Sequence, residues 1–238
     1  MIDVLILGGT GFPHGEGISE TFARRLDPSR FRYRYVDYPA QYGNPIPYDE
    51  SVAIGTSALL WAIQEAANPV LLAGYSQGAG IAAQVAEQVG AGQHPDLEVV
   101  GAALIACPWR PPGPAVLGDP GGYGISGALE IQGMPVWYAA AVRDPITALP
   151  RGSMLRSVAD LTGYWSATDP TKAVQWAESM AAAVREHRLQ EWWSPFTLWD
   201  SFGALRQVSA YAAEGRHTDA YITEGHCAAL ADAVNRVL

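Results

Sequence analysis

The segment 69–83 constrains what this chain can fold into more than any other part of the sequence. It begins with a short apolar run at 70–73, which is typical of a strand buried on both faces. The run leads into Gly74-Tyr75-Ser76-Gln77-Gly78, which matches the pattern G-x-S-x-G, and apolar residues then recur at helical spacing. A strand, a sharp turn and a helix in this order form the context in which the pattern presents a nucleophilic serine. A glycine-rich turn can match by chance, but the flanking elements favour Ser76 as a nucleophile.

The chain up to residue 145 alternates between apolar runs and helical patterns. Strands are predicted at 3–7, 31–36, 70–73, 99–106 and 136–142, and helices at 18–26, at 49–67, after the G-x-S-x-G segment and at 226–238. Strands joined by helices predict an α/β fold with a mostly parallel sheet and a ligand cleft at the carboxyl ends of its strands. We expect residues 1–145 and 216–238 to form this core. Residues 146–215 have helical patterns throughout and are predicted to form an insertion that covers one side.

The composition excludes several classes of protein. With 238 residues, the chain is long enough for one large domain, or for one domain with an insertion. Its net charge of −9 argues against nucleic-acid binding, which needs clustered lysine and arginine. No apolar run approaches the length of a transmembrane segment, and the N-terminus lacks the basic start and cleavage site of a signal peptide. We therefore expect a protein that is made in a cytoplasm and does not span a membrane.

The cysteines point to no metal and no disulfide. Cys107 and Cys227 are too few for a disulfide framework or a cysteine metal site, and both occur in apolar stretches. We expect two buried thiols and no cofactor.

The glycine-rich loop after the first predicted strand, Gly8-Gly9-Thr10-Gly11, resembles part of a dinucleotide-binding fingerprint. That fingerprint needs a helix to begin at once, whereas Pro13 delays the helix here. In proteins with a serine elbow, one donor to the oxyanion is the N–H after the nucleophile, and the second comes from a loop after an earlier strand. This predicts that the backbone N–H groups of Gln77 and Thr10 form an oxyanion hole.

A serine nucleophile needs a base, and the base needs a carboxylate that orients it. In elbow-type proteins these groups follow in the order serine, acid, histidine. We favour Asp144 as the acid because it follows the last predicted strand at its carboxyl end, although a turn residue before proline would occupy the same place. The competing aspartates cap a helix, lie in a glycine- and proline-rich loop or fall in the insertion; they are Asp119, Asp160, Asp169 and Asp200.

Two histidines follow the predicted acid near the end of the chain. His217 lies in a polar loop after a helical pattern, which suits a base that must reach both Ser76 and Asp144. His226 opens the last predicted helix, where a structural role would also explain it. We favour His217. The others are less suitable, since His14 precedes the nucleophile, His94 lies at the opposite end of the sheet and His187 lies near a helix end between arginines.

Three short segments carry a resemblance to a known family. Gly-Tyr-Ser-Gln-Gly-Ala at 74–79, Arg-Asp-Pro at 143–145 and His-Thr-Asp-Ala-Tyr at 217–221 resemble the cutinase-like serine esterases, and among them most the lysin B enzymes of mycobacteriophages. The missing secretion signal, the missing disulfide framework and the long helical linker between acid and histidine also fit lysin B.

The resemblance implies an α/β-hydrolase that cleaves the ester joining mycolic acids to arabinogalactan, with Ser76 as nucleophile, Asp144 as acid and His217 as base. It implies a lipid or cell-wall ester as the substrate. It also implies synthesis in a host cytoplasm and action at the cell envelope after release. The mycobacterial PE-PPE esterases share the same elbow, so a lipid esterase with no part in lysis is an alternative. A catalytically idle module of a phage particle is a second.

The predicted insertion is rich in tryptophan. Aromatic residues at helical spacing usually pack in a core. They can also form an apolar wall or lid over an acyl chain, and for that role the candidates are Trp192, Trp193 and Trp199.

Overall fold

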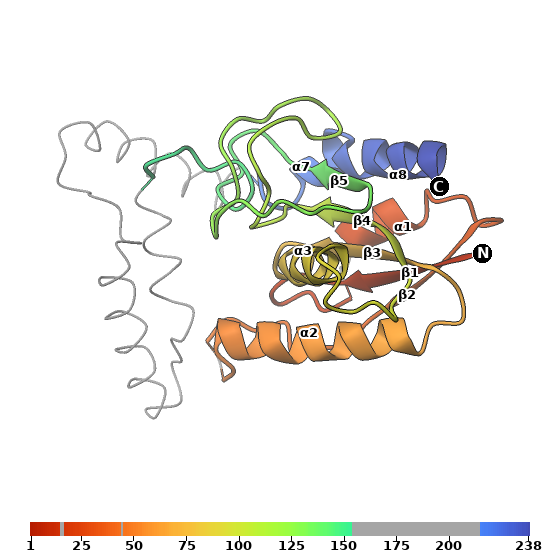
Figure 1. The fold of residues 1–238 in the computed structure, drawn as a ribbon. Helices are drawn as coiled ribbons and strands as arrows, with labels where there is room; N and C mark the ends of the chain where they lie inside the picture. Colours follow the sequence, from red (N-terminus) through yellow and green to blue (C-terminus); the bar gives the residue numbers. More distant parts are fainter. Residues whose placement is uncertain (15–16, 44, 154–214) are drawn as a thin grey trace.

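A parallel sheet organises the protein (Figure 1). The computed structural model describes residues 1–14, 17–43, 45–153 and 215–238, and in these residues five strands pair in the order β2-β1-β3-β4-β5, every pair parallel. The elements in chain order are β1 (Ile2–Leu7), α1 (Ile18–Ala23), β2 (Phe31–Tyr35), α2 (Tyr48–Gln64), β3 (Val70–Tyr75), α3 (Gln77–Gly90), β4 (Val99–Ile105), β5 (Val136–Ala139), α7 (Ala220–Thr223) and α8 (His226–Val237). The predicted α/β fold with a parallel sheet is confirmed.

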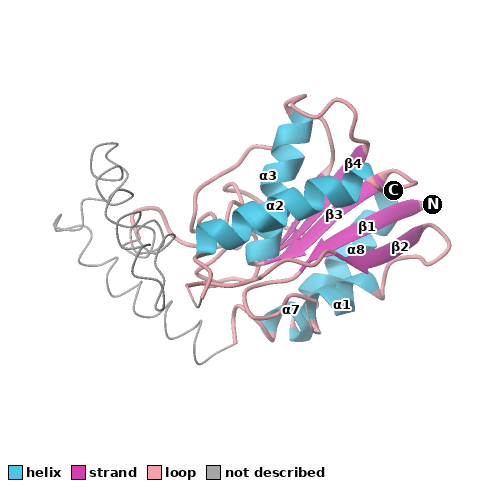
Figure 2. Cartoon of the chain, turned by 90° about the horizontal axis from the view of Figure 1, so that it is seen from below, coloured by secondary structure: helices cyan, strands magenta, loops and turns pink. Residues whose placement is uncertain are grey.

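Helices cover both faces of the sheet (Figures 1 and 2). Because successive side chains of a strand point to opposite faces, Val4 and Ile6 of β1 pack with α1 and α8, while Leu5 and Leu7 pack with α2 and α3. The central strand β3 is buried along its whole length, which explains its continuous apolar sequence. This two-sided burial fixes the carboxyl end of β3, where the elbow begins.

The outer strands differ from the sequence expectation in detail. Strand β2 covers the predicted strand at 31–36 to within one residue and lies at the edge of the sheet, where Arg32, Tyr33 and Arg34 are all exposed. A strand at the edge of a sheet has a neighbouring strand on one side only, so fewer atoms cover its side chains than those of a central strand. Strand β5 ends at Ala139, three residues before the predicted end at 142, because the chain turns where the N–H of Asp144 donates to the carbonyl of Ala141.

The start of the predicted helical insertion is not helical. Residues 146–153 form turns, and Leu149 pairs with Tyr123 in an isolated bridge. This segment packs against the loop after β4, since the N–H of Ile125 donates to the carbonyl of Ile146 over 2.8 Å. The rest of the predicted insertion, 154–214, lies outside the described residues; it includes Asp160, Trp165, Asp169, Trp176, His187, Trp192, Trp193, Trp199 and Asp200.

The end of the chain contains one element that the sequence did not predict, the short helix α7. The final helix α8 matches its predicted range and buries Cys227, Leu230 and Val234 against α1 and the sheet. Cys107 is buried as well, so the expectation of two buried free thiols is confirmed. None of the described helices is both long and apolar enough to span a bilayer.

Two glycines allow the elbow to pack against the sheet. A Cβ atom on Gly78 would lie 2.3 Å from the carbonyl oxygen of Leu7, and one on Gly74 would lie 2.4 Å from the carbonyl of Gly78. The N–H of Gly78 donates to the carbonyl of Gly8, which ties the start of α3 to the end of β1. Strand, turn and helix can therefore meet only without side chains at these two positions.

This close packing predicts a large difference between two glycine substitutions. Gly78→Ala should lower the free energy of unfolding by about 3 kcal/mol or more, because backbone atoms would have to move. Gly92→Ala is the control: Gly92 has a φ of +75° but no atoms within reach of a Cβ, so a loss of about 1–2 kcal/mol is expected there. Urea unfolding of both variants measures the difference, and equal losses would contradict it.

Candidate active site

Ser76 lies in the sharp turn between β3 and α3. Its backbone has a φ of 54° and a ψ of −116°, a conformation that residues with a side chain rarely adopt. The turn is held because the N–H of Ser76 donates to the carbonyl of Ile105 in β4, and the carbonyl of Ser76 accepts from the N–H of Gly80. The hydroxyl is thereby presented at the carboxyl edge of the sheet, at the N-terminus of α3.

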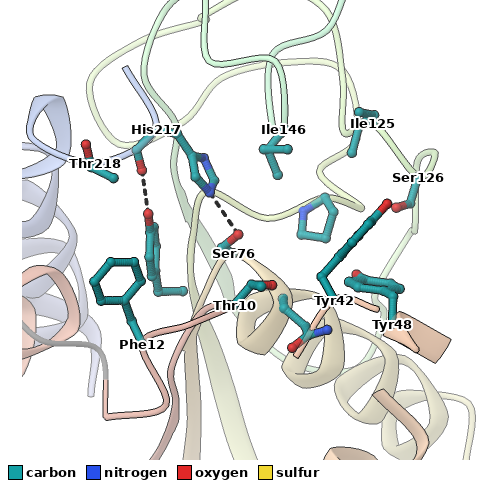
Figure 3. A pocket seen from close by; sticks show the side chains of 13 residues that line it. Thr10, Phe12, Tyr42, Tyr48, Ser76, Ile125, Ser126, Ile146, His217 and Thr218 are labelled. Carbon is teal, nitrogen blue, oxygen red and sulfur yellow. Dashed lines mark hydrogen bonds between the residues drawn. The ribbon is translucent and has the colours of Figure 1, made fainter. Parts of the chain in front are cut away.

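The structure brings together the three side chains that the sequence analysis selected, and Figure 3 shows the contact between two of them, Ser76 and His217. The Nε2 atom of His217 lies 2.8 Å from Ser76 Oγ, and its Nδ1 atom lies 3.1 and 3.0 Å from the two carboxylate oxygens of Asp144. A carboxylate only accepts hydrogen bonds, so the proton of a neutral His217 belongs on Nδ1, which leaves Nε2 free to accept the hydroxyl proton of Ser76. Asp144 is fully buried and His217 is 5% exposed. The geometry is that of a serine nucleophile with its base and orienting acid.

Tyr221 also holds the carboxylate of Asp144. Its hydroxyl donates to Asp144 Oδ2 over 2.6 Å and accepts from the N–H of Ala141, while the N–H of Ile146 donates to Oδ1. Burial, and then the charge of Asp144, raise the pKa of Tyr221 well above its usual value, so the hydroxyl stays protonated and remains a donor. The sequence analysis missed this residue. Tyr221 closes the segment 217–221 that carries the family resemblance, but nothing in that segment indicated a contact with Asp144.

Tyr75 holds His217 in a similar way. Its hydroxyl donates to the backbone carbonyl of His217 over 2.6 Å, and its ring stacks on the imidazole with 5.3 Å between ring centres. Tyr75 occupies a variable position of the G-x-S-x-G pattern, so the pattern gave no reason to select it. The elbow therefore supplies both Ser76 and a support for His217.

Backbone strain is concentrated at this edge of the sheet. Among the described residues, four other than glycine have positive φ values, and each follows a different strand: Ala40 after β2, Ser76 after β3, Ala106 after β4 and Arg143 after β5. Such conformations persist only where the surrounding structure enforces them, and they gather at functional sites. At Arg143 the turn directs the next residue, Asp144, into the protein.

The two predicted oxyanion donors lie at the same place. Gln77 is the first residue of α3, and it lines the same pocket as Thr10 and Ser76. Figure 3 shows Thr10 close to Ser76. Within the described part of the chain, neither backbone N–H donates to another residue. The Gln77 side chain donates to the carbonyl of Gln41 and contacts the hydroxyl of Ser51, which joins the elbow to the loop after β2. The proposed oxyanion role of Thr10 and Gln77 stays a prediction.

A pocket of about 420 Å³ opens beside Ser76. Its described walls come from the loops after β1, β2, β4 and β5, with His217 and Thr218 on one side (Figure 3). The loop after β2 lines it through Tyr42. The lining residues that the structure describes include no aspartate, glutamate, lysine or arginine; they are Thr10, Phe12, Tyr42, Tyr48, Tyr75, Ser76, Gln77, Pro108, Ile125, Ser126, Ile146, His217 and Thr218.

The competing histidines lie elsewhere. His226 begins α8, where it is buried against the ring of Tyr221 and lies 3.4 Å from Glu224, which itself pairs with Arg216. Burial lowers the pKa of His226, which favours the neutral form that a structural position needs. His14 pairs with Asp37 at the surface, and His94 contacts Gln88.

The competing aspartate Asp119 accepts a hydrogen bond from the N–H of Gly121, as a turn residue does. In the described residues, no group of three metal-binding side chains lies close together.

Comparisons with known proteins place this geometry in context. Residues 31–113, which include the elbow, match the PE-PPE domain family. The search of curated proteins gave no match. Among solved structures, lysin B from mycobacteriophage D29 is similar, with a TM-score of 0.52 and 19% identity over 79% of this chain and 90% of that one.

Two other solved structures have lower scores. A cutinase-like protein from Cryptococcus sp. has a TM-score of 0.48 and 17% identity over 78% of this chain and 90% of that one. An acetyl xylan esterase has a TM-score of 0.44 and 19% identity over 76% of this chain and 95% of that one. At this level of identity, the likeness to lysin B concerns the fold.

The bond from Tyr221 to Asp144 predicts an effect on any reaction that uses His217 as a base. Tyr221→Phe removes one hydrogen bond to a buried charge, and such a bond contributes about 1.5–3 kcal/mol. We therefore expect kcat/KM for a short-chain ester to fall about tenfold or more, and the melting temperature to fall as well. Tyr35→Phe is the matched control, because the Tyr35 hydroxyl is buried without a hydrogen-bond partner in the described structure. Equal activity in the two variants would contradict the role given to Tyr221.

Proposed function

We propose that the protein is a serine esterase that acts on lipid esters. One observation carries the proposal: Ser76, His217 and Asp144 form a continuous hydrogen-bonded chain at the mouth of an apolar pocket. A serine hydroxyl is a weak nucleophile by itself, and a base held in one orientation by a buried carboxylate is the arrangement that activates it. The match to the PE-PPE domain family and the fold shared with lysin B support the same reading.

The reaction follows from the positions of these groups. Ser76 gives its hydroxyl proton to Nε2 of His217 while Oγ attacks the ester carbonyl carbon. The carbonyl oxygen takes up the negative charge and accepts hydrogen bonds from the N–H groups of Gln77 and Thr10. His217 then passes the proton to the leaving alcohol, which yields an acyl-enzyme. Water, deprotonated by His217, attacks this acyl group, and the acid leaves as Ser76 regains its proton.

The pocket favours an apolar acyl group. Phe12, Tyr42, Tyr48, Ile125 and Ile146 contribute aromatic and aliphatic surface, and the described lining residues carry no fixed charge. A charged acyl group would lose its hydration there without gaining a partner of opposite charge. Lipid esters fit this environment better than esters of small charged acids.

Within this class, we propose the ester between mycolic acid and arabinogalactan as the substrate. The resemblance of segments 74–79, 143–145 and 217–221 to lysin B sequences supports this choice, as does the shared fold. The protein would then be made in a host cytoplasm and act at the cell envelope after release. The match of residues 31–113 to the PE-PPE domain family favours a second candidate function, that of a lipid esterase with no part in lysis.

A short-chain p-nitrophenyl ester assay tests the enzyme class. The protein should release p-nitrophenol, and Ser76→Ala should reduce the rate by at least about a thousandfold, because the covalent step is lost. Ser126→Ala is the control, since it removes a pocket hydroxyl that does not contact His217. If neither the protein nor the control variant hydrolyses any ester, a non-catalytic binding module replaces the proposal.

A comparison of two natural substrates tests the finer proposal. If the mycolate ester is the substrate, the protein should release free mycolic acid from mycobacterial cell-wall material, and Ser76→Ala should not. Triglyceride emulsions are the comparison substrate. Hydrolysis of triglycerides without any mycolate release would favour the second candidate.

A further inference from the structure

Arg110 is a buried cation to which the mechanism so far gives no role. It lies in the loop after β4 and is 1% exposed. All five of its N–H donors bind backbone carbonyl oxygens, at 2.7–3.0 Å. The acceptors are the carbonyls of Pro111, Gly113, Gly121, Gly122 and Thr147.

A guanidinium in this position is costly to bury. No carboxylate in the described residues forms an ion pair with it, and burial lowers its pKa. Five carbonyl dipoles compensate for the lost hydration, and each would be left without that donor if Arg110 were replaced by an apolar residue. The position therefore depends on the fork geometry of arginine, which a lysine ammonium with three donors does not reproduce.

The carbonyls that Arg110 binds belong to two segments that meet at the pocket. Four of them lie in residues 108–126, here named the wall segment, which contributes Pro108, Ile125 and Ser126 to the pocket lining. The fifth, from Thr147, lies in residues 144–149, here named the acid loop, which carries Asp144.

The two segments are also joined directly by their backbones. The N–H of Ile125 in the wall segment donates to the carbonyl of Ile146 in the acid loop over 2.8 Å, and the N–H of Ile146 donates to Asp144 Oδ1 over 2.9 Å. The N–H of Gly124 donates to the carbonyl of Arg110 itself. A short covalent and hydrogen-bonded route thus leads from the guanidinium to the carboxylate that orients His217.

We propose that Arg110 is a positioning residue that fixes the wall segment against the acid loop, and that it thereby sets both the orientation of Asp144 and the shape of the acyl pocket. This proposal rests on the proposed esterase function. Arg110 contacts neither the substrate nor the reacting atoms, so its effect passes through Asp144 and through the pocket wall.

Arg110→Lys tests the proposal in the folded enzyme. It keeps the charge but cannot bind five carbonyls, so the acid loop and wall segment should shift, and kcat for a p-nitrophenyl ester should fall about a hundredfold. KM should also rise, and more for a decanoate than for an acetate ester, because the wall contacts the acyl chain. Arg34→Lys is the matched control: Arg34 also donates to a backbone carbonyl, that of Ala62, but at the edge strand far from the site, so kcat and KM should stay unchanged. All rates are taken at least ten degrees below the melting temperature of each variant.

Chemical rescue separates positioning from a general loss of structure. Arg110→Ala leaves a space lined by five carbonyls, and millimolar guanidinium should restore part of kcat with saturation. An equal concentration of sodium chloride should not. Unchanged kcat and KM in Arg110→Lys would overturn the proposal, and so would a loss of equal size for both ester lengths that guanidinium does not reverse.

A measurement on the unaltered protein tests the coupling between the wall segment and the acid loop if neither variant folds, or if the protein proves not to be an esterase. Hydrogen exchange should show the N–H groups of Ile125 and Ile146 opening with the same free energy, as one cooperative unit. Independent and fast exchange of the two segments would overturn the proposal. An inactive protein whose two segments open together would refute the esterase function while leaving the coupling by Arg110 in place.

Discussion

The site depends on one constraint, the left-handed backbone of Ser76 at the end of a fully buried strand. With a φ of 54°, this residue holds its hydroxyl 2.8 Å from His217 while the chain reverses into α3. The reversal is possible because Gly74 and Gly78 leave space for neighbouring backbone, and because β3 is fixed between β1 and β4. A nucleophile held in this way requires no reorganisation to meet its base, which is the form of preorganisation that catalysis rewards.

His217 and Asp144 are held by residues from distant parts of the described chain. Tyr75 of the elbow supports the imidazole, and Tyr221 of α7 supports the carboxylate. Arg110 ties the acid loop to the wall segment after β4. Tyr75, Arg110 and Tyr221 are distant in sequence, yet Tyr75 contacts His217, Tyr221 contacts Asp144, and Arg110 binds the loop that carries Asp144. This explains how a site can be precise even though most of its members lie on loops.

Much of the fold and three site residues could be predicted from the sequence. The continuous apolar runs of β3 and β4 reflect burial on both faces, so their position inside a parallel sheet could be predicted. Ser76, Asp144 and His217 follow from a local pattern and from chain order. Tyr75, Tyr221 and Arg110 could not be selected, because their roles depend on partners 142, 77 and 37 positions away, which no local pattern encodes. The prediction of a helix at 146–153 was wrong for a similar reason. The backbone of this segment forms hydrogen bonds with the wall segment instead of helical ones, and a local sequence pattern does not reveal such distant partners.

The central claim is that Ser76 is a nucleophile activated by His217, and covalent labelling tests it most directly. The protein is incubated with a fluorophosphonate, and its intact mass and peptides are measured over time. The account predicts one phosphonyl group per chain, on the peptide that contains Ser76, with labelling slowed by at least about a hundredfold in His217→Ala. Failure of the protein to react, reaction at another serine, or equally fast labelling of the His217 variant would contradict it.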